Sequence, residues 1–402
     1  MTNEKITQLK SEVKSELINN ILPFWSTRMV DNTKGGFFGR IDGHGNVHPE
    51  ADKGSVLNAR ILWTFSSAYR ILNNPEYLTI ATRAKDYLLT HFIDKEYGGV
   101  YWLINSKGEM ADGKKQIYGL AFTIYALSEY YRCTKDKESL QKAIDLFKLI
   151  ELHSFDNNLG GYFEAFSREW KEIGDLRLSE KDANEKKTMN THLHVLEAYT
   201  NLYRVWKDEI LKKQLHELLI IFVEKIVNKN THHLNLFFEE NWTDKSDLVS
   251  YGHDIEASWL LCEAAQVLGD SELIKKVKEL CLSIADAAME GLMSDGSLVY
   301  EKFSATKHID TDRHWWVQSE TIVGYVNAYE LSGKEDYLTK GMSAWKFVTD
   351  HLIDKKNGEW FWSVDKELMP NLKDDKAGFW KCPYHNSRMC FEIIEREIKK
   401  VS

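Results

Sequence analysis

Residues 97–102 read YGGVYW, a glycine turn followed at once by aromatic and β-branched residues. Similar stretches recur along the chain, at GGFFGR (35–40), LGGYFEAF (159–166), LNLFFEENW (234–242), DGSLVYEKF (295–303) and NGEWFWSV (357–364). The copies lie 63, 62, 75, 60 and 62 residues apart, counted between residues 36, 99, 161, 236, 296 and 358. A period of this length indicates a repeated supersecondary unit, and the whole chain is therefore interpreted as six similar units.

Each interval between copies has room for two helices, and the sequence supplies two of different character. Residues 139–151, SLQKAIDLFKLIE, place apolar side chains on one side, which is the pattern of a helix at the outside of a protein. The preceding stretch, KQIYGLAFTIYALSEYY from residue 115, is apolar nearly all round and predicts a helix enclosed by others. Residues 76–369 contain no proline, which suits helices joined by short turns.

The pairing of an enclosed helix with a one-sided helix recurs through the chain. Enclosed inner helices are predicted near 53–72, 115–132, 186–205, 250–268, 314–331 and 376–396. A one-sided outer helix precedes each glycine turn, the first of them at 4–21. Helical hairpins of this kind can bury their inner helices only by closing on one another. The sequence therefore predicts an all-α fold, an (α/α)6 barrel with short β segments at one rim, and a single domain over residues 1–402.

Composition limits the class of partner. The chain has 402 residues, 43% of them hydrophobic, with a formal net charge of −9 and a pI near 5.9. This balance disfavours nucleic acid and acidic membrane surfaces and favours a neutral or polar small molecule. The first residues form a charged amphipathic pattern rather than a signal peptide, and no long apolar run follows, so we expect a cytoplasmic protein. Nothing in the sequence indicates an oligomeric state.

Motifs for metals and cofactors are missing. The five cysteines are scattered without a C-x-x-C pair, which argues against disulfides and structural zinc; we interpret most as core residues, with a catalytic thiol as the alternative. No H-E-x-x-H cluster occurs, and the histidines come from separate repeats, so no metal is expected. The usual glycine-rich phosphate loops are also missing, and no cofactor is expected.

Polar and aromatic residues unusual for an enclosed helix gather near the start of each predicted inner helix. They are Arg60, Tyr118, Asn190, His194, His253, Glu256, Trp316, Glu320, Trp380 and His385. In a closed barrel these helix starts meet at one mouth, so we expect the side chains to form one polar pocket. His253 and Glu256 are three residues apart and lie on the same helix face. Each residue alone could be a core hydrogen bonder or a helix cap, but recurrence across repeats favours a site.

Other histidines are expected to lie elsewhere. His192 and His194 are two residues apart and face different directions on a helix. Asn190 lies four residues before His194 on the same face, which favours His194 for the pocket. His232 and His233 belong to the polar stretch NKNTHHLN and are expected to be solvated.

Histidines without a metal or cofactor are suited to proton transfer. An unperturbed pKa of about 6.5 lets imidazole take and return a proton near neutral pH. An arginine in the same pocket can stabilise negative charge that develops on oxygen. The chain also has 13 tryptophans, whose ring faces can stack on the C–H face of a sugar. The sequence therefore indicates proton abstraction beside a carbonyl of a sugar.

Four segments resemble motifs of the N-acylglucosamine 2-epimerase superfamily: KTMNTHLHVLEAY (187–199), GHDIEASWLL (252–261), RHWWVQSE (313–320) and GFWKCPYHNSR (378–388). The resemblance spans nearly the whole chain. It implies an (α/α)6 barrel and cofactor-independent epimerisation at C2 of the reducing-end glucose of β-1,4-linked disaccharides such as cellobiose and lactose. It also implies His253 and His385 as an acid/base pair and His194 as a third essential histidine. The substrate contacts that it implies are Arg60, Tyr118, Asn190, Glu256, Trp259, Trp316, Glu320 and Trp380.

Several alternatives explain part of the pattern. Glycoside hydrolases use two carboxylates, which Glu256 and Glu320 could supply, but that function leaves the histidines unexplained. An aldose–ketose isomerase of the mannose type would pass through the same enediol, and an N-acylglucosamine 2-epimerase is a further candidate. A sugar-binding protein without catalysis would leave the histidine pair unexplained.

Overall fold

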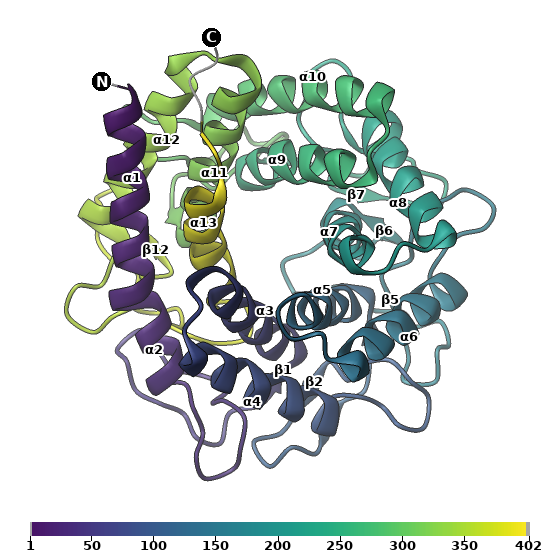
Figure 1. The fold of residues 1–402 in the computed structure, drawn as a ribbon. Coiled ribbons are helices and arrows are strands. Elements are labelled where there is room, and N and C mark those ends of the chain that lie inside the picture. Colours follow the sequence, from purple (N-terminus) through teal and green to yellow (C-terminus); the bar gives the residue numbers. More distant parts are fainter. Residues whose placement is uncertain (1, 399–402) are drawn as a thin grey trace.

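The computed structural model describes residues 2–398, and its helices form two concentric rings (Figure 1). Within this range, the inner ring consists of α3 (Ser55–Leu72), α5 (Ile117–Thr134), α7 (Met189–Val205), α9 (Tyr251–Leu268), α11 (Trp315–Ser332) and α13 (Tyr384–Glu395). Each inner helix packs on the next one in the sequence, and α13 closes the ring against α3. This closure confirms the predicted (α/α)6 barrel.

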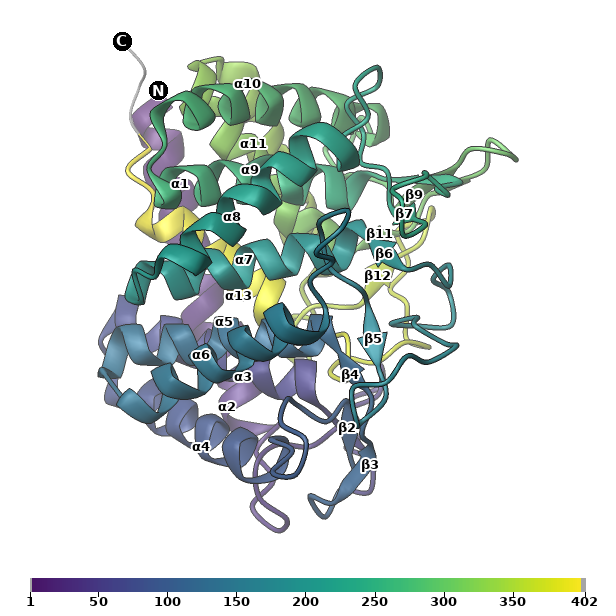
Figure 2. The same cartoon turned by 90° about the vertical axis from the view of Figure 1, so that its right-hand side faces the viewer.

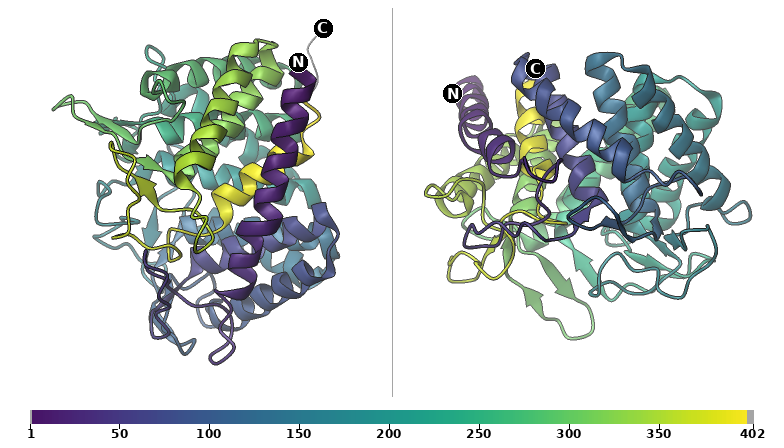
Figure 3. Two further views of the ribbon diagram at one scale, coloured as in Figure 1. Left: turned by 90° about the vertical axis from the view of Figure 1, so that its left-hand side faces the viewer. Right: turned by 90° about the horizontal axis from the view of Figure 1, so that it is seen from below.

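The outer ring covers the inner one. It contains α1 (Thr2–Glu16), α2 (Leu22–Thr27), α4 (Pro75–His91), α6 (Lys137–His153), α8 (Glu209–Ile221), α10 (Ser271–Ala288) and α12 (Glu335–Phe347). Short segments continue some of these helices, namely η1 (Leu17–Ile21), η2 (Phe222–Ile226), η3 (Met289–Gly291) and η4 (Val348–Leu352). Helix α1 packs on α13, so the first and last helices lie side by side and the chain closes its own ring (Figure 3).

A recurring turn explains why inner and outer helices alternate. Several inner helices end in a residue with left-handed backbone geometry: Asn73, Lys135, Gly269 and Gly333. The next residue occupies the N-cap position of the following outer helix, and in three of these turns its side chain caps the helix; for example, the Asp136 carboxylate accepts a hydrogen bond from the Ser139 N–H. A left-handed C-terminal residue followed directly by an N-cap reverses the chain within two residues in these hairpins.

The two rings differ in burial as the sequence predicts. In α5 every residue from Ile117 to Tyr130 is buried, whereas α6 buries one face, which includes Ala143, Phe147 and Ile150. The inner helices are therefore enclosed on all sides, and the outer helices remove apolar surface of the inner ring from water.

Short strands gather at the end of the barrel where the inner helices begin (Figure 2). Antiparallel pairs connect the start of an inner helix to the next glycine-turn copy: β1 (Lys53–Gly54) with β2 (Leu103–Ile104), β4 (Lys115–Gln116) with β5 (Ala165–Phe166), β6 (Lys187–Thr188) with β7 (Phe237–Phe238), β8 (Leu248–Ser250) with β9 (Glu301–Phe303), and β11 (Arg313–His314) with β12 (Ser363–Val364). Two sheets gain a third strand, β3 (Met110–Asp112) and β10 (Ile309–Asp310). The predicted β segments at one rim are confirmed.

Buried ion pairs hold the same rim. A lysine just before an inner helix bonds to an aspartate of the preceding glycine turn, with Nζ to oxygen distances of 2.7–3.1 Å: Lys53 to Asp31, Lys115 to Asp94 and Lys187 to Asp156. Lys376 and Asp354 form the same pair in the last repeat. Because breaking a buried pair leaves an uncompensated charge, these contacts fix where the inner helices begin.

Ion pairs also cross the opposite end of the barrel, where the inner helices end. Arg70 of α3 bonds to Glu129 of α5 and to Glu395 of α13, each at 2.6 Å. Arg204 of α7 bonds to Glu263 of α9 at 2.6 Å. These contacts join neighbouring inner helices, and Arg70 joins the first of them to the last.

The last inner helix is shorter than predicted. Helix α13 begins at Tyr384 rather than near residue 376, and Pro383 occupies its N-cap position. Proline has no N–H to donate and clashes with a preceding helical turn, so it favours a helix start. Residues 376–383 instead form a loop that leads Trp380 to the rim.

Among residues 2–398, no helix is both long and apolar enough to cross a membrane. The predicted domain also includes residues 1 and 399–402, which lie outside the described residues.

Replacing Glu164 by glutamine is expected to stabilise the fold increasingly as pH rises. The Glu164 carboxyl accepts hydrogen bonds from the Thr188 N–H and the Thr191 hydroxyl at the start of α7. Burial raises its pKa from 4.5 to about 8, although those bonds oppose the shift. Between these values the folded chain keeps a proton that the unfolded chain has lost, so wild-type stability falls as pH rises.

Glutamine does not titrate, so its advantage over glutamate should grow by roughly 1 kcal/mol per pH unit in this window. Urea unfolding of both proteins at pH 5 and pH 8 measures the effect. If the unfolding free energies of the two proteins differ by the same amount at pH 5 and pH 8, Glu164 does not hold the extra proton.

Candidate active site

Residues from α3, α5 and α7 form one side of the predicted pocket. The Arg60 Nη2 donates a hydrogen bond to the Tyr118 hydroxyl at 2.9 Å. The ring centre of Tyr118 lies 5.0 Å from that of His194 and 5.9 Å from that of Trp380. The first three repeats and the loop before α13 therefore meet here, as the sequence predicts.

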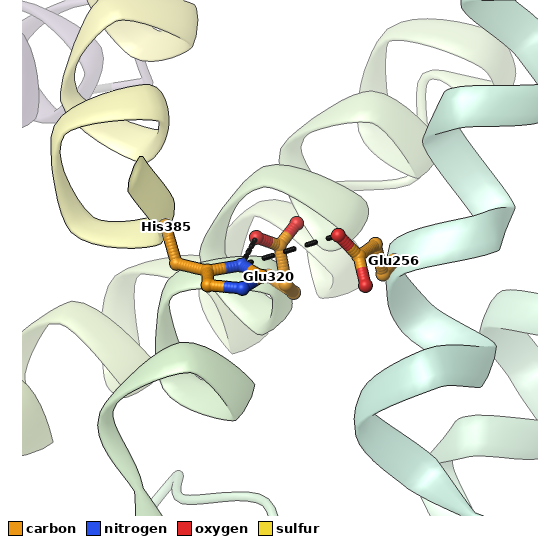
Figure 4. Close-up of side chains that lie close together, drawn as sticks. All are labelled: Glu256, Glu320 and His385. Atoms are coloured by element: carbon orange, nitrogen blue, oxygen red, sulfur yellow. Dashed lines mark hydrogen bonds and ion pairs between the residues drawn. The ribbon is translucent and has the colours of Figure 1, made fainter. Parts of the chain in front are cut away.

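The other side is formed by α9, α11 and α13. The Trp316 ring centre lies 4.9 Å from His253 and 5.6 Å from His385, so the tryptophan contacts both imidazoles. Figure 4 shows Glu256, Glu320 and His385 pointing toward one another from these three helices. The His385 Nδ1 lies 2.7 Å from a Glu320 oxygen and 3.9 Å from a Glu256 oxygen.

The histidines of the pocket share one arrangement. Each is held through Nδ1 by an oxygen at 2.7–2.9 Å: His194 by Glu197, His253 by Ser250 and His385 by Glu320. Within the described chain, none of their Nε2 atoms has a hydrogen-bond partner. A carboxylate can only accept, so at His194 and His385 the Nδ1 atom carries a hydrogen, and Nε2 is the ring nitrogen left to exchange a proton. These imidazoles are therefore oriented to exchange a proton through Nε2.

Both histidines of the predicted acid/base pair are neutral at physiological pH. Burial, followed by the charge of His194, lowers the pKa of His253 to about 3. Burial lowers the pKa of His385 well below its ordinary value, and the positive charges of Arg60 and Arg388 lower it further. A neutral imidazole can accept a proton directly, without first losing one.

Arg388, which the sequence analysis did not single out, lies at the centre of the charged groups. Its Nη1 donates to Glu197 at 2.5 Å, and its Nη2 donates to Glu256 at 2.5 Å and to Glu320 at 2.6 Å. It also bonds to the Tyr384 hydroxyl. One guanidinium thus connects α7, α9, α11 and α13 and holds the carboxylates that surround His194 and His385.

The carboxylates differ in their affinity for protons. Burial disfavours the charge of Glu197, but Arg388 and His194 outweigh it and lower the pKa to about 2. Burial and then the neighbouring Glu320 raise the pKa of Glu256 to about 7, against the attraction of Arg388. Burial also raises the pKa of Glu320. Near neutral pH the cluster therefore carries an ionised Glu197 and a partly protonated Glu256.

Arg60 is a buried cation without a carboxylate partner among residues 2–398. Besides Tyr118, its guanidinium contacts the Cys382 sulfur at 3.3 Å and lies over the rings of Phe122 and Tyr384, at 4.1 Å and 4.6 Å from their centres. Burial opposes its charge, but Cys382 and Tyr118 keep the pKa above the usual value. Its unneutralised charge is available to an oxyanion.

Aromatic and amide groups complete the wall. Trp316 and Trp380 are half-buried, and Trp380 borders a surface cavity of about 190 Å³ together with Arg40, Trp362 and Phe379. The side-chain oxygen of Asn190 is buried and has no partner in the described structure. These groups have free surface or free hydrogen-bonding capacity for a polar ligand.

Two expectations from the sequence are wrong. Trp259 cannot offer its face to substrate, because its ring is fully buried beneath the Arg388 guanidinium at 4.7 Å and its Nε1 donates to Glu320 at 3.0 Å. His233 is not solvated: it is buried, and its Nδ1 lies 2.7 Å from Asp254. His192 follows the expectation for it, since its Nδ1 bonds to the Thr188 carbonyl and lies outside the pocket cluster.

The same cluster could offer a metal its ligands, since donor atoms of Glu256, Glu320 and His385 lie within 4.8 Å of one another. Arg388 already bonds to both carboxylates through one nitrogen, however. A divalent cation there would sit against a fixed positive charge, which disfavours it. The donor set therefore does not fit a resident metal.

Comparisons with known proteins agree with this arrangement. The sequence model of the N-acylglucosamine 2-epimerase (GlcNAc 2-epimerase) family matches residues 36–387. The cellobiose 2-epimerase of Bacteroides fragilis is 58% identical over 96% of this chain and 98% of its own, and that of Dictyoglomus turgidum is 41% identical over 96% and 98%. The structure of cellobiose 2-epimerase from Bacillus thermoamylovorans superposes with a TM-score of 0.93 at 43% identity, covering 97% of this chain and 99% of that one.

Proposed function

Because the chain belongs to the N-acylglucosamine 2-epimerase family, we propose that it epimerises the reducing-end glucose of β-1,4-linked disaccharides at C2. It is a carbohydrate epimerase that converts cellobiose to glucosyl-mannose and lactose to epilactose. Its partner is a small sugar in the cytoplasm, and the reaction uses side chains of one catalytic domain without a cofactor.

The strongest support for this proposal is that His253 and His385 are neutral and share one orientation. His253 and His385 are neutral, are held through Nδ1 and have free Nε2 atoms, and both contact Trp316. The unneutralised cation Arg60 belongs to the same pocket. Two neutral bases beside an unpaired guanidinium suit removal and return of a proton at a carbon next to a carbonyl.

The first step opens the sugar ring. His194, whose counter-charge is the ionised Glu197, gives a proton from Nε2 to the ring oxygen. His385 takes the proton of the C1 hydroxyl, and the bond between C1 and the ring oxygen breaks. An aldehyde forms at C1, which makes the hydrogen at C2 acidic. His194 is now neutral and His385 is protonated.

The second step inverts C2. His253 removes the C2 proton, and the negative charge that moves to O1 faces the Arg60 guanidinium. His385 then gives its proton to the opposite face of C2. His253 returns its proton to O1 while His194 recovers one from the ring hydroxyl, so the ring closes and every histidine regains its first state. The reverse reaction exchanges the roles of His253 and His385.

Glycoside hydrolysis fits the geometry poorly. A retaining hydrolase needs its two carboxylates on either side of the scissile bond, with the sugar between them. Here one nitrogen of Arg388 bonds to Glu256 at 2.5 Å and to Glu320 at 2.6 Å, so a guanidinium occupies the space between these carboxylates.

Parallel reactions with cellobiose, mannose and N-acetylglucosamine test the substrate class. We expect cellobiose to give glucosyl-mannose, with product identified by chromatography against standards. Fructose from mannose as the main product would instead make the protein an aldose–ketose isomerase. Turnover confined to N-acetylglucosamine would make it a monosaccharide epimerase, and free glucose from cellobiose would make it a hydrolase.

Glu256 is expected to control the pH dependence. Its pKa is about 7, so its ionised fraction rises through neutral pH. The ionised carboxylate, 3.9 Å from the His385 Nδ1, stabilises the protonated form of His385 that the mechanism needs. kcat/KM for cellobiose should therefore rise with pH to a plateau, with a midpoint near that pKa.

Glu256→Gln should lower kcat/KM by about tenfold and remove this rise, because glutamine does not titrate. Initial rates between pH 5.5 and 8.5 give both profiles. The same midpoint in the variant would assign the titration to another group.

A further inference from the structure

Cys382 occupies an unusual position beside the Arg60 guanidinium. It lies directly before Pro383 and helix α13, and its side chain is fully buried. The Arg60 Nη1 donates to its sulfur at 3.3 Å, while the thiol donates to the Trp380 carbonyl oxygen at 3.4 Å. The thiol therefore bridges the arginine of the pocket and the backbone of the half-buried Trp380.

We propose that Cys382 is a positioning residue that orients Arg60 toward the substrate oxygens and leaves the charge of Arg60 unneutralised. This inference rests on the proposed function, in which Arg60 stabilises the enediolate. Cys382 itself does not contact the reacting atoms.

The contrast with Arg388 supports this role. Arg388 bonds to Glu197, Glu256 and Glu320, and its charge is balanced by them. Among residues 2–398, Arg60 has no carboxylate partner: it contacts the Cys382 sulfur, the Tyr118 phenol and the aromatic rings beneath it. In a buried site a charge acts strongly on a nearby oxyanion, and a carboxylate partner would cancel much of that field. A thiol fixes the direction of the guanidinium at little electrostatic cost.

The hydrogen bond from the Cys382 thiol to the Trp380 carbonyl oxygen links Arg60 to an aromatic residue proposed to contact the substrate. Trp380 lies at the rim and its ring centre is 5.9 Å from that of Tyr118, which shares Arg60 with Cys382. Movement of the Trp380 backbone would therefore move the sulfur and with it the guanidinium. Cys382 couples the aromatic wall to the cation that receives the negative charge.

A series at position 382 tests the proposal, with Cys390→Ala as the matched control. Cys390 is also fully buried and lies on α13 without a contact to Arg60. Cys382→Ala should lower kcat for cellobiose by about tenfold to a hundredfold with little change in KM, because an interaction made in the transition state is weakened. Cys382→Ser should recover part of the loss, and Cys390→Ala should keep nearly the wild-type kcat.

Ligand binding separates a charge effect from a packing effect. The probes are cellobiitol, which is neutral, and a disaccharide hydroxamate, whose deprotonated form is an anionic mimic of the enediolate. In Cys382→Asp the introduced carboxylate faces Arg60, so titration calorimetry should show the hydroxamate weakened by about tenfold or more while cellobiitol changes little. Circular dichroism confirms that each variant is folded.

Equal losses for both ligands, or unchanged kcat in Cys382→Ala, would overturn the proposal. A wild-type protein that neither binds these ligands nor epimerises cellobiose would instead overturn the proposed function. The two failures are therefore distinguishable.

Discussion

His385→Ala is expected to lower kcat for cellobiose by about a hundredfold to ten-thousandfold, the range for loss of a general acid or base. His253→Ala should have an effect of the same size, because both imidazoles act at C2 in the proposed mechanism. The loss should fall on kcat more than on KM, since the proposed sugar contacts Trp316, Trp380 and Asn190 remain in the variant. Steady-state rates by chromatography measure this effect.

The control is His216→Ala, which removes a histidine from the outer helix α8, away from the pocket. It should keep the wild-type kcat. If His385→Ala or His253→Ala retained most of the wild-type rate in a folded protein, that histidine would have no place in the mechanism.

Arg388→Met is expected to cost about 3–5 kcal/mol of unfolding free energy, because it leaves buried carboxylates without their cation. Glu197, Glu256 and Glu320 all bond to this guanidinium. Without it they stay buried only by taking up protons, so the folded variant binds more protons than its unfolded chain. The difference in unfolding free energy between wild type and this variant should therefore grow as pH rises from 5.5 to 8.5.

Urea unfolding at several pH values gives this deficit. The matched control is Arg204→Met at the far end of the barrel, where Arg204 and Glu263 are partly exposed and their pair should contribute about 1 kcal/mol or less. A deficit for Arg388→Met that is small or independent of pH would show that the carboxylates do not depend on Arg388.

The barrel could be predicted because its signals are local and repeated. Each glycine turn marks the end of an outer helix, and left-handed residues such as Gly269 and Gly333 followed by a cap mark the hairpins. The start of α13 was misplaced because apolar residues recur from Ala377 through Cys382 up to Pro383, whose missing N–H decides the boundary.

Part of the candidate site could be predicted from where its residues lie in the repeats. Arg60, Tyr118, His194, His253 and His385 lie near the starts of inner helices, and closure of the ring brings them together. Arg388 was missed although a signal for it exists. Glu197, Glu256 and Arg388 each follow a pocket histidine by three residues, on α7, α9 and α13 respectively. That shared spacing predicts a common face and could have identified all of them.

Other features needed the three-dimensional structure. The local sequence NKNTHHLN gives no reason to bury His233, whose partner Asp254 comes from the neighbouring inner helix. Tryptophan is a residue type that often stacks on sugars, so the sequence favours this role for Trp259. Only the structure shows that Arg388 packs on its ring and that its Nε1 donates to Glu320. Tertiary contacts of this kind leave no pattern in the residues themselves.

In the proposed mechanism, histidines of this site move a proton at C2 of the reducing-end sugar. Proton and carbon NMR of cellobiose incubated with the protein in deuterium oxide tests it most directly. We expect a reducing-end mannose that carries deuterium at C2, with no free glucose, and loss of this signal in His253→Ala and His385→Ala. Glucosyl-mannose that keeps its original C2 hydrogen would contradict proton exchange at the histidines, and free glucose would contradict epimerisation itself.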